Sequence, residues 1–512
     1  MAASRSLRVG VALPLPTGLD FEVSDMWLPS LGGFELKITF MNTFAEPQNV
    51  SAEFAAEVNQ VVVDQFAQRV GNLCDLVRIQ GIAWEAFDAA NLSRSAEAIK
   101  ALFDQLEIFD SVKIVTAKIG DTDKDGSPAI LAHRAAKNGK PHFLLYAHHD
   151  VQPPGPEEDW NTPAFEPTLL NGRIYGRGAA DDKAGVVAHL TALSALKIIA
   201  GKDFEVGVSL FIEGEEEAGS ESFRNFLEDN KRQLQADAIV VADSGNWTVE
   251  IPALTTTLRG VVTQPIEVKT LDHALHSGMY GGVVPDATLA LIRILASLHN
   301  PDGSVAVAGL ARSEGAELPY PEQSLRDDSG ILDGVQLIGN GSILSRVWTQ
   351  PSITVIGMDT KPVAVASNTM LPSATAVISM RIAPGDEPDS AAEKLREHIS
   401  ANTPFGAKVI FGPHQGGRPF SSDTEGWAFK VAKDALGAAF GNESVEMGIG
   451  GSIPFIAELT EVFPNAQILV TGVEDADSRA HSPNESVHLD TLKNAMVAEA
   501  LMLLNANRLE RA

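Results

Sequence analysis

Cysteine is nearly absent from this chain, since Cys74 is the only one in 512 residues. A single cysteine cannot form a disulfide within the chain, and a zinc site built from several cysteines is excluded as well. Proteins of the reducing cytoplasm share this scarcity, so a cytoplasmic location is predicted. Apolar runs are also short, because none reaches the roughly 18 residues that a membrane-spanning helix needs. We therefore expect no membrane span.

Positive charge is also scarce. The chain holds 39 Lys and Arg against 67 Asp and Glu, which gives a formal net charge of -28. Such a chain repels the phosphates of nucleic acids and of anionic membranes, so neither is an expected partner. A small substrate or a metal ion fits this charge better. With 44% hydrophobic and 21% charged residues the composition is that of a globular protein, and the length predicts two or three domains.

The order of apolar patterns predicts an α/β fold with a second domain inserted into the first. Over residues 41–254 strand-like runs alternate with helical ones, as in the helical "AGVVAHLTALSALKIIA" and the strand-like "FEVGVSLFI" that follows it. Residues 255–419 have their own set of strands and helices, which predicts a compact α+β domain. Residues 420–512 then return to the first domain. Residues 1–40 lack a clear period and are expected to form an N-terminal extension.

Three adjacent carboxylates, Glu215, Glu216 and Glu217, follow directly after "FEVGVSLFI". In open α/β sheets, ligands bind in the crevice beyond the carboxyl ends of the strands. Three like charges in that position are unfavourable unless water or a cation compensates them. Taken alone, the stretch is explained more simply by a solvated acidic turn. Metal or catalytic chemistry requires further ligands elsewhere in the chain.

Such ligands stand at the ends of other strand-like runs and in Gly-marked loops. His148 stands near the end of "HFLLYAHHD", and Asp150 follows two residues later, where a carboxylate can fix the tautomer of the imidazole. His149 should point the opposite way and is predicted to be structural. The other candidates are Asp181 in "GRGAADDK", Glu217, Asp243 in "VVADSG" and His481 in "RAHSPNE". Asp243 alone would be interpreted as a turn residue, and His481 as a surface histidine, but together these residues suit a metal site.

An ordered series of motifs resembles the aminoacylase and carnosinase type of two-metal peptidases and deacylases, and its dipeptidases in particular. The series runs "HHDVQP", "YGRGAADDKAG", "EGEEEAGS", "ADSG", "LHSGMYGG", "SMRIAP", "GGSIP" and "AHSPNE", and spans about residues 147–485. The resemblance implies a mixed-sheet catalytic domain with an inserted ferredoxin-like domain that serves as a lid and as a dimerisation surface.

The resemblance also implies two divalent metal ions that share the carboxylate of Asp181. Zinc is the expected metal, with manganese or cobalt as alternatives. The peptide bond between Asp181 and Asp182 would be cis. The ligands would be His148, Asp181 and Asp243 at one ion and Asp181, Glu217 and His481 at the other.

Catalytic roles follow from the same resemblance. Glu216 would act as general base and acid on a hydroxide that bridges the two metals. Asp150 would orient His148, and His276 in "LHSG" would stabilise the oxyanion in the partner subunit of a homodimer. The substrate would be held by Arg381, Thr369, Gly451 and Ser452, with the arginine gripping a carboxylate.

The predicted function is the metal-dependent hydrolysis of dipeptides or short peptides by a cytoplasmic homodimer. An N-acyl amino-acid deacylase would use the same metal core and stays an alternative. A metal-loaded peptide-binding protein without turnover would need the ligands but no proton shuttle such as Glu216. The histidines outside these motifs are predicted to be structural, namely His133, His142, His189, His273, His299, His398, His414 and His488.

Overall fold

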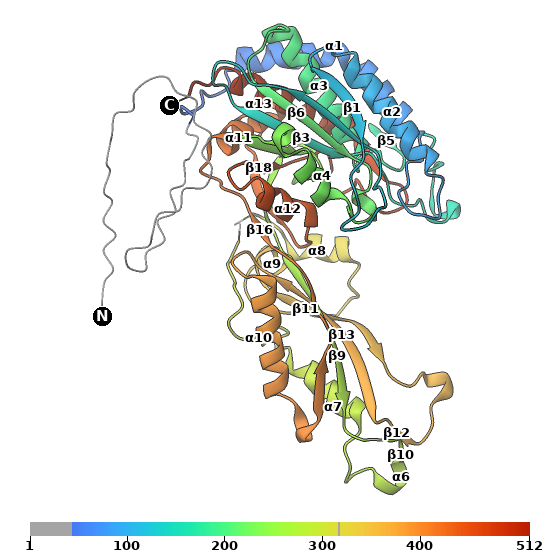
Figure 1. The fold of residues 1–512 in the computed structure, drawn as a ribbon. Coiled ribbons are helices and arrows are strands. Elements are labelled where there is room, and N and C mark those ends of the chain that lie inside the picture. Colours follow the sequence, from blue (N-terminus) through green and yellow to red (C-terminus); the bar gives the residue numbers. More distant parts are fainter. Residues whose placement is uncertain (1–43, 316–317, 512) are drawn as a thin grey trace, which may run out of the picture. The chain divides into compact units, whose positions relative to one another are not determined.

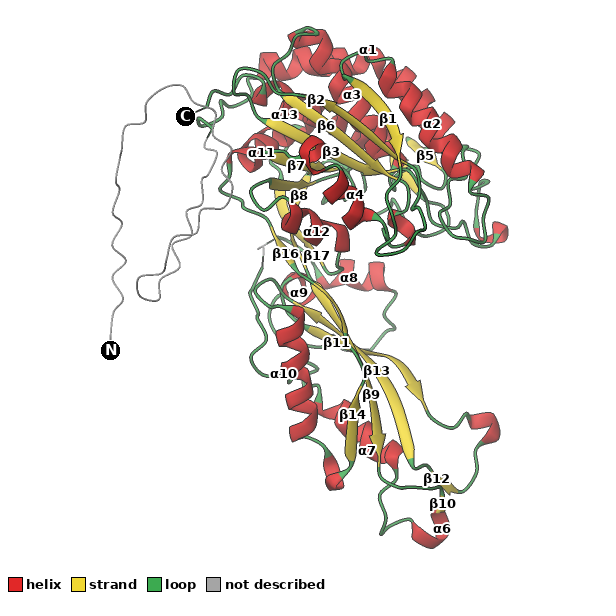
Figure 2. Ribbon diagram, in the orientation of Figure 1, coloured by secondary structure: helices red, strands yellow, loops and turns green. Residues whose placement is uncertain are grey.

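The computed structural model describes residues 44–315 and 318–511, so the predicted extension over residues 1–40 lies outside the described residues. Figures 1 and 2 show a large sheet with helices on both faces and a smaller sheet with helices of its own. The large sheet has the strand order β1-β2-β6-β3-β7-β18-β8-β16, and β17 pairs with β8. The bounds are β1 (Ser111–Val115), β2 (Ala129–Arg134), β3 (His142–His148), β6 (Gly207–Glu213), β7 (Ala238–Val241), β8 (Ala253–Leu258), β16 (Phe420–Ser421), β17 (Val445–Ile449) and β18 (Gln467–Val470).

Parallel strands form the centre of the large sheet, where β6, β3, β7 and β18 pair in that order. The strands β3 and β6 are buried along nearly their whole length, as expected for apolar parallel strands covered on both faces. Antiparallel strands extend the sheet on both sides. The predicted mixed α/β fold is therefore confirmed. Because the parallel strands end at one edge, the residues that follow them emerge side by side.

Two apolar cores hold helices against the faces of this sheet. One core includes α1 (Ala52–Val77), α2 (Ala90–Asp104), α3 (Lys183–Ala200), α11 (Trp427–Phe440) and α13 (Leu489–Ala506). The other includes α4 (Phe223–Asp229), α5 (Lys231–Leu234) and α12 (Pro454–Val462). Side chains fix where the first helices begin. Ser51 caps α1 by accepting the N–H of Phe54 at 3.2 Å, and Asp182 caps α3 by accepting the N–H of Gly185 at 3.2 Å.

Among the described residues, α3 is the helix whose length and composition would allow it to cross a membrane. Its 18-residue window is 78% buried inside the protein, and α3 packs against α1, α13 and β3. An apolar helix that is covered on most sides is a core helix of the large domain.

The smaller sheet has the order β11-β13-β9-β14, with β15 also paired to β9, and all of its pairings are antiparallel. Taken along the chain, the elements follow a βαββαβ order, which is the ferredoxin-like topology predicted. Strands β9 and β13 alternate buried and half-buried residues, because α7 and α10 cover one face only. The bounds are β9 (Gly260–Lys269), α7 (Ala287–Ser297), β11 (Ser352–Asp359), β13 (Ser373–Ile382), α10 (Pro388–Ala401), β14 (Lys408–Phe411) and β15 (Gln415–Gly417).

Short elements complete both sheets. Next to the smaller sheet lie β10 (Leu275–His276), α6 (Ser277–Tyr280), α8 (Glu322–Ser329), α9 (Ile343–Trp348) and β12 (Thr369–Met370). A separate three-stranded sheet contains β4 (Thr168–Leu170), β5 (Arg173–Tyr175) and β19 (Ser486–His488) in the order β19-β5-β4. Only Arg259 separates β8 of the large sheet from β9 of the smaller one. The smaller sheet therefore begins after Leu258, a few residues beyond the predicted domain boundary at residue 255.

Candidate metal centre

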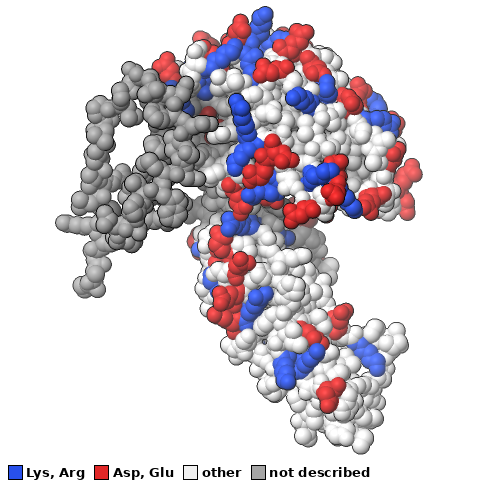
Figure 3. Space-filling view, viewed as in Figure 1, with Lys and Arg blue, Asp and Glu red and all other residues white. Residues whose placement is uncertain are grey.

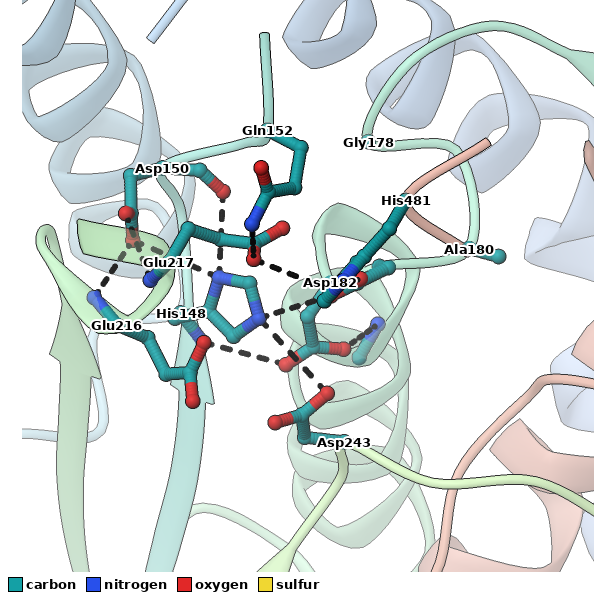
Figure 4. Close-up of polar contacts among 12 residues, drawn as sticks. His148, Asp150, Gln152, Gly178, Ala180, Asp182, Glu216, Glu217, Asp243 and His481 are labelled. Atoms are coloured by element: carbon teal, nitrogen blue, oxygen red, sulfur yellow. Dashed lines mark hydrogen bonds and ion pairs between the residues drawn. The ribbon is translucent and has the colours of Figure 1, made fainter. Parts of the chain in front are cut away.

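His148 is the fully buried last residue of β3. Its Nε2 atom lies 2.9 Å from Asp181 Oδ1 and 3.7 Å from Asp243 Oδ1. Asp243 comes two residues after β7, the parallel neighbour of β3. Figure 4 shows His148 between Asp150 on one side and Asp243 on the other. The carboxyl edge of the sheet thus gathers three side chains that are far apart in the sequence.

Asp181 joins this group to a second one. Its Oδ1 atom faces His148, while its Oδ2 atom lies 3.0 Å from His481 Nε2, which is itself 3.2 Å from Glu217 Oε2. In each triad the atoms that could bind a metal lie within 4.8 Å of one another. The peptide bond between Asp181 and Asp182 is cis, as the motif resemblance predicts. The structure brings the five predicted ligands together as two triads, His148–Asp181–Asp243 and Asp181–Glu217–His481.

The electrostatics of the two triads favour bound cations. Hydrogen bonds to Asp181 and Glu217 raise the pKa of His481 to about 11. Burial opposes protonation of His148, yet its hydrogen bonds to neighbouring aspartates outweigh burial and raise its pKa well above the ordinary value. Both shifts show that the acids attract positive charge to this position. Divalent ions would supply that charge and leave both imidazoles neutral, the form that binds metals. The donor set therefore fits a pair of divalent ions.

Asp150 connects the first triad to the acidic turn. Its side chain is fully buried, and its Oδ1 atom lies 3.5 Å from His148 Nδ1. The two oxygens of this carboxylate also accept the backbone N–H groups of Glu216 and Glu217, each at 3.1 Å. His148 Nδ1 also lies 3.2 Å from the backbone carbonyl oxygen of Asp150. A proton on Nδ1 that donates to Asp150 leaves Nε2 of His148 as the nitrogen with the free lone pair, facing Asp181. Asp150 is thus placed to set both the tautomer of His148 and the position of the turn.

The three adjacent glutamates have different surroundings around the short helix η2 (Glu216–Ala218). Glu215 is buried and accepts the backbone N–H groups of Ser127 and Ser222, each at 2.7 Å. The Glu217 side chain is 2% exposed and faces His481. Burial raises the pKa of the Glu216 carboxyl well above its ordinary value. The alternative interpretation of this stretch as a solvated acidic turn is therefore wrong.

The residues predicted to bind substrate, together with His276, form two pairs. The guanidinium of Arg381, on β13, donates to Ser452 Oγ at 3.2 Å, next to Gly451. His276 of β10 stands opposite Thr369 of β12 in an antiparallel pair. The hydrogen bonds and ion pairs found among the described residues do not join either pair to the two triads.

Sequence reasoning missed three buried or partly buried residues around the triads. Gln152 donates from Nε2 to Glu217 Oε2 at 2.7 Å. Lys183 is fully buried and donates from Nζ to two carbonyl oxygens at the end of α1, and burial lowers its pKa to about 7. Glu485 accepts four hydrogen bonds from the segment that carries Asp181. All three lie in quoted motifs or beside them, but their spacing carries no signal of these contacts.

A mixed α/β sheet whose carboxyl edge carries two acid and histidine triads with a common aspartate is the arrangement of a two-metal hydrolase. Comparison with known proteins gives the family. The chain belongs to Peptidase family M20/M25/M40, whose sequence profile matches residues 144–505. The family predicted from the motifs is thereby confirmed.

The relatives of this chain include dipeptidases. It is 36% identical over 410 residues to the cysteinylglycine-S-conjugate dipeptidase of Corynebacterium striatum, which covers 77% of this chain and 89% of that protein. It is 28% identical over 451 residues to a Cys-Gly metallodipeptidase of Schizosaccharomyces pombe, covering 83% and 92%. The crystal structure of human carnosine dipeptidase 1 shares the fold, with a TM-score of 0.68 and 22% identity over 90% of this chain and 100% of that chain.

Proposed function

We propose that this chain hydrolyses dipeptides or short peptides with two divalent metal ions held by the two triads. The observation that carries the proposal is the position of Asp181, whose two carboxylate oxygens face His148 and His481 separately. One carboxylate placed between two ligand groups is suited to bridge two cations. The dipeptidase names of the relatives support a dipeptide substrate.

The ligand set also bears on which metal binds. Two imidazole nitrogens and three carboxylates suit zinc, and they also suit manganese or cobalt. We propose zinc, with His148 and Asp243 completing one site and Glu217 and His481 completing the other.

Glu216 is the proposed proton carrier. A metal pair bound by the triads would polarise the scissile carbonyl and acidify a water molecule. Glu216 accepts the proton of the attacking water and then donates a proton to the departing amine. Asp150 acts through other residues, since it holds the N–H of Glu216 and faces Nδ1 of His148.

The carboxylate end of the substrate is assigned to Arg381. A guanidinium binds a carboxylate through two parallel hydrogen bonds, and Ser452 holds Arg381 in place at 3.2 Å. Gly451 and Thr369 are proposed to contact the backbone of the substrate. A free carboxylate on the substrate therefore contributes to binding.

We further propose a homodimer, in which His276 of one copy stabilises the oxyanion in the active site of a second copy. The tip that follows His276 is apolar and open to solvent, with Met279 74% exposed and Val283 89% exposed. On β11, the edge strand of the smaller sheet, Ile356 and Met358 are exposed as well. Figure 3 shows few charged side chains around α6 on the visible face. Such apolar surface favours burial against another protein surface.

The proposal is tested by assaying zinc-, manganese- and cobalt-loaded protein on dipeptides and on N-acetyl and N-succinyl amino acids. We expect metal-dependent cleavage of dipeptides, which a chelator abolishes and added metal restores. Preference for the acylated amino acids would favour the deacylase instead. Metal binding without turnover of any substrate would favour the peptide-binding protein.

A further inference from the structure

We propose that Glu485 is a positioning residue that shapes the Asp181 loop to receive the metal pair. This role rests on the proposed metal site. Glu485 lies four residues after His481 and is fully buried. It touches neither substrate nor metal in the proposed chemistry, and its effect would pass through the backbone that carries Asp181.

The carboxylate of Glu485 gathers the donors of one short loop. Its Oε1 atom accepts the backbone N–H groups of Ala180 at 2.9 Å and of Asp181 at 3.1 Å. Its Oε2 atom accepts the backbone N–H of Gly178 at 3.0 Å and the guanidinium of Arg177 at 2.7 Å. Each oxygen therefore accepts two hydrogen bonds, and three of the four donors are backbone groups. The loop conformation at Asp181 depends directly on this side chain.

The charge of Glu485 is balanced inside the protein. Arg177 is 1% exposed, and its guanidinium lies 5.5 Å from the centre of the Trp160 ring. A buried carboxylate next to a buried guanidinium avoids the cost of an unpaired charge. A glutamine at this position would turn its NH₂ group toward one pair of donors, so only a carboxylate can accept from all four.

The segment of Glu485 also carries the ligand His481. His481 and Asn484 lie in one tight turn, and both have positive φ angles, of 61° and 66° respectively. Asn484 Oδ1 accepts the backbone N–H of Asn161 at 2.7 Å, and the backbone N–H of Gly176 donates to the carbonyl of Glu485 at 2.9 Å. One turn therefore fixes His481 and the loop of Asp181 relative to each other, which is what a shared bridging ligand requires.

The test compares the metal-free wild type with Glu485→Gln by calorimetric titration with Zn²⁺ alone and by the absorption spectrum of the Co²⁺ form. Residues that orient metal ligands typically change metal affinity about 10- to 100-fold when substituted. We expect a loss of that size, an altered Co²⁺ spectrum, and a lower kcat with little change in KM for a dipeptide. Should Glu485→Gln not fold, Glu485→Asp keeps the charge opposite Arg177 but shortens the reach to the loop, and the same losses are expected.

Asp475→Asn is the matched control. Asp475 is a buried carboxylate in the same segment, and it accepts two hydrogen bonds from the guanidinium of Arg173, at 3.0 and 2.8 Å. Loss of this carboxylate in Asp475→Asn should lower the melting temperature of the metal-free protein without changing its Zn²⁺ affinity. Equal Zn²⁺ affinity in the wild type and both Glu485 variants would overturn the positioning role, as would an equal loss in Asp475→Asn. A wild type that binds no divalent ion would instead overturn the proposed metal pair.

Discussion

Glu215, Glu216 and Glu217 are the same amino acid, and only their surroundings separate them. Glu215 accepts hydrogen bonds from two backbone N–H groups, and Glu217 faces His481. Burial raises the pKa of the Glu216 carboxyl well above its ordinary value, and it raises the pKa of Glu217 as well. The sequence predicted the acidic cluster. The motif resemblance predicts that Glu217 binds metal while Glu216 carries the proton, and this division of roles stays a prediction. The sequence carries no sign of the role of Glu215. Its partner Ser127 comes from another part of the fold, and its partner Ser222 comes from the following loop.

Replacing Glu216 by Gln should lower kcat by about 10²- to 10⁴-fold, the usual contribution of a general base and acid. The amide keeps the shape of the side chain, so bound metal and KM should change little. Glu215→Gln is the control, since it should lower the melting temperature while kcat stays near that of the wild type. Full turnover by Glu216→Gln would show that another group carries the proton.

His142 should make the stability of the protein depend on pH. Burial, followed by the nearby charge of His133, lowers the pKa of His142 to about 4, while an unfolded histidine titrates near 6.5. The unfolded chain therefore binds more protons between these values, and stability falls as the pH drops through this window. The loss from this residue should reach roughly 3 kcal/mol near pH 4.

Denaturant unfolding at pH 4.5 and pH 7 measures this dependence. His142 packs against the His133 ring, at 5.2 Å between ring centres, and its Nε2 atom lies 2.8 Å from Ser209 Oγ. His142→Gln removes this titrating group and should reduce the slope of unfolding free energy against pH. The part that comes from His149, whose pKa burial also lowers to about 4, should remain. An unchanged slope in the variant would contradict the assignment.

Elements with a strong apolar period were predictable, and junctions between them were not. The patterns of α3, β3 and β6 are long and unambiguous, and the structure has these elements in the predicted places. At Arg259 the pattern does not show where one sheet ends and the other begins, because β8 and β9 are both rich in β-branched residues and a single residue separates them. Contacts such as those of Glu485 were also unpredictable, since they join residues more than 300 positions apart.

Arg259 links the β8–β9 junction to the proposed substrate loop. It donates from Nε to the carbonyl of Gly450 at 2.9 Å and from Nη1 to Ser352 Oγ at 3.1 Å. Burial, followed by the charge of Arg381, lowers its pKa to about 10. A lysine lacks the planar, forked set of donors of an arginine. Arg259→Lys therefore cannot bind the Gly450 carbonyl and Ser352 Oγ together, and Gly451 and Ser452 should lose their fixed position.

Steady-state kinetics on a dipeptide should show KM rising by about tenfold in Arg259→Lys, because a misplaced binding loop weakens substrate orientation. Arg396→Lys is the control, since Arg396 bonds to Gln264 and His414 in the smaller sheet. An unchanged KM in Arg259→Lys would show that the contacts of Arg259 do not influence substrate binding.

At the scale of the whole molecule, each copy of the proposed dimer contributes one catalytic group, His276, to the active site of the other copy. His276→Ala and Glu216→Gln should each have little activity as pure proteins. If the copies mix freely, half of the dimers are mixed and each of these has one intact site, so activity should return to about a quarter of the wild-type value. Mixing with no recovery, while a pull-down through a tag on one variant recovers the other variant, would contradict the role of His276 across the interface.

The shared position of Asp181 between two divalent ions is tested most directly by anomalous X-ray scattering from crystals of the metal-loaded protein. We expect two peaks, one between His148, Asp181 and Asp243 and one between Asp181, Glu217 and His481, about 3.5 to 4 Å apart as in other two-metal sites. A single peak, or metal bound away from Asp181, would contradict the two-metal centre.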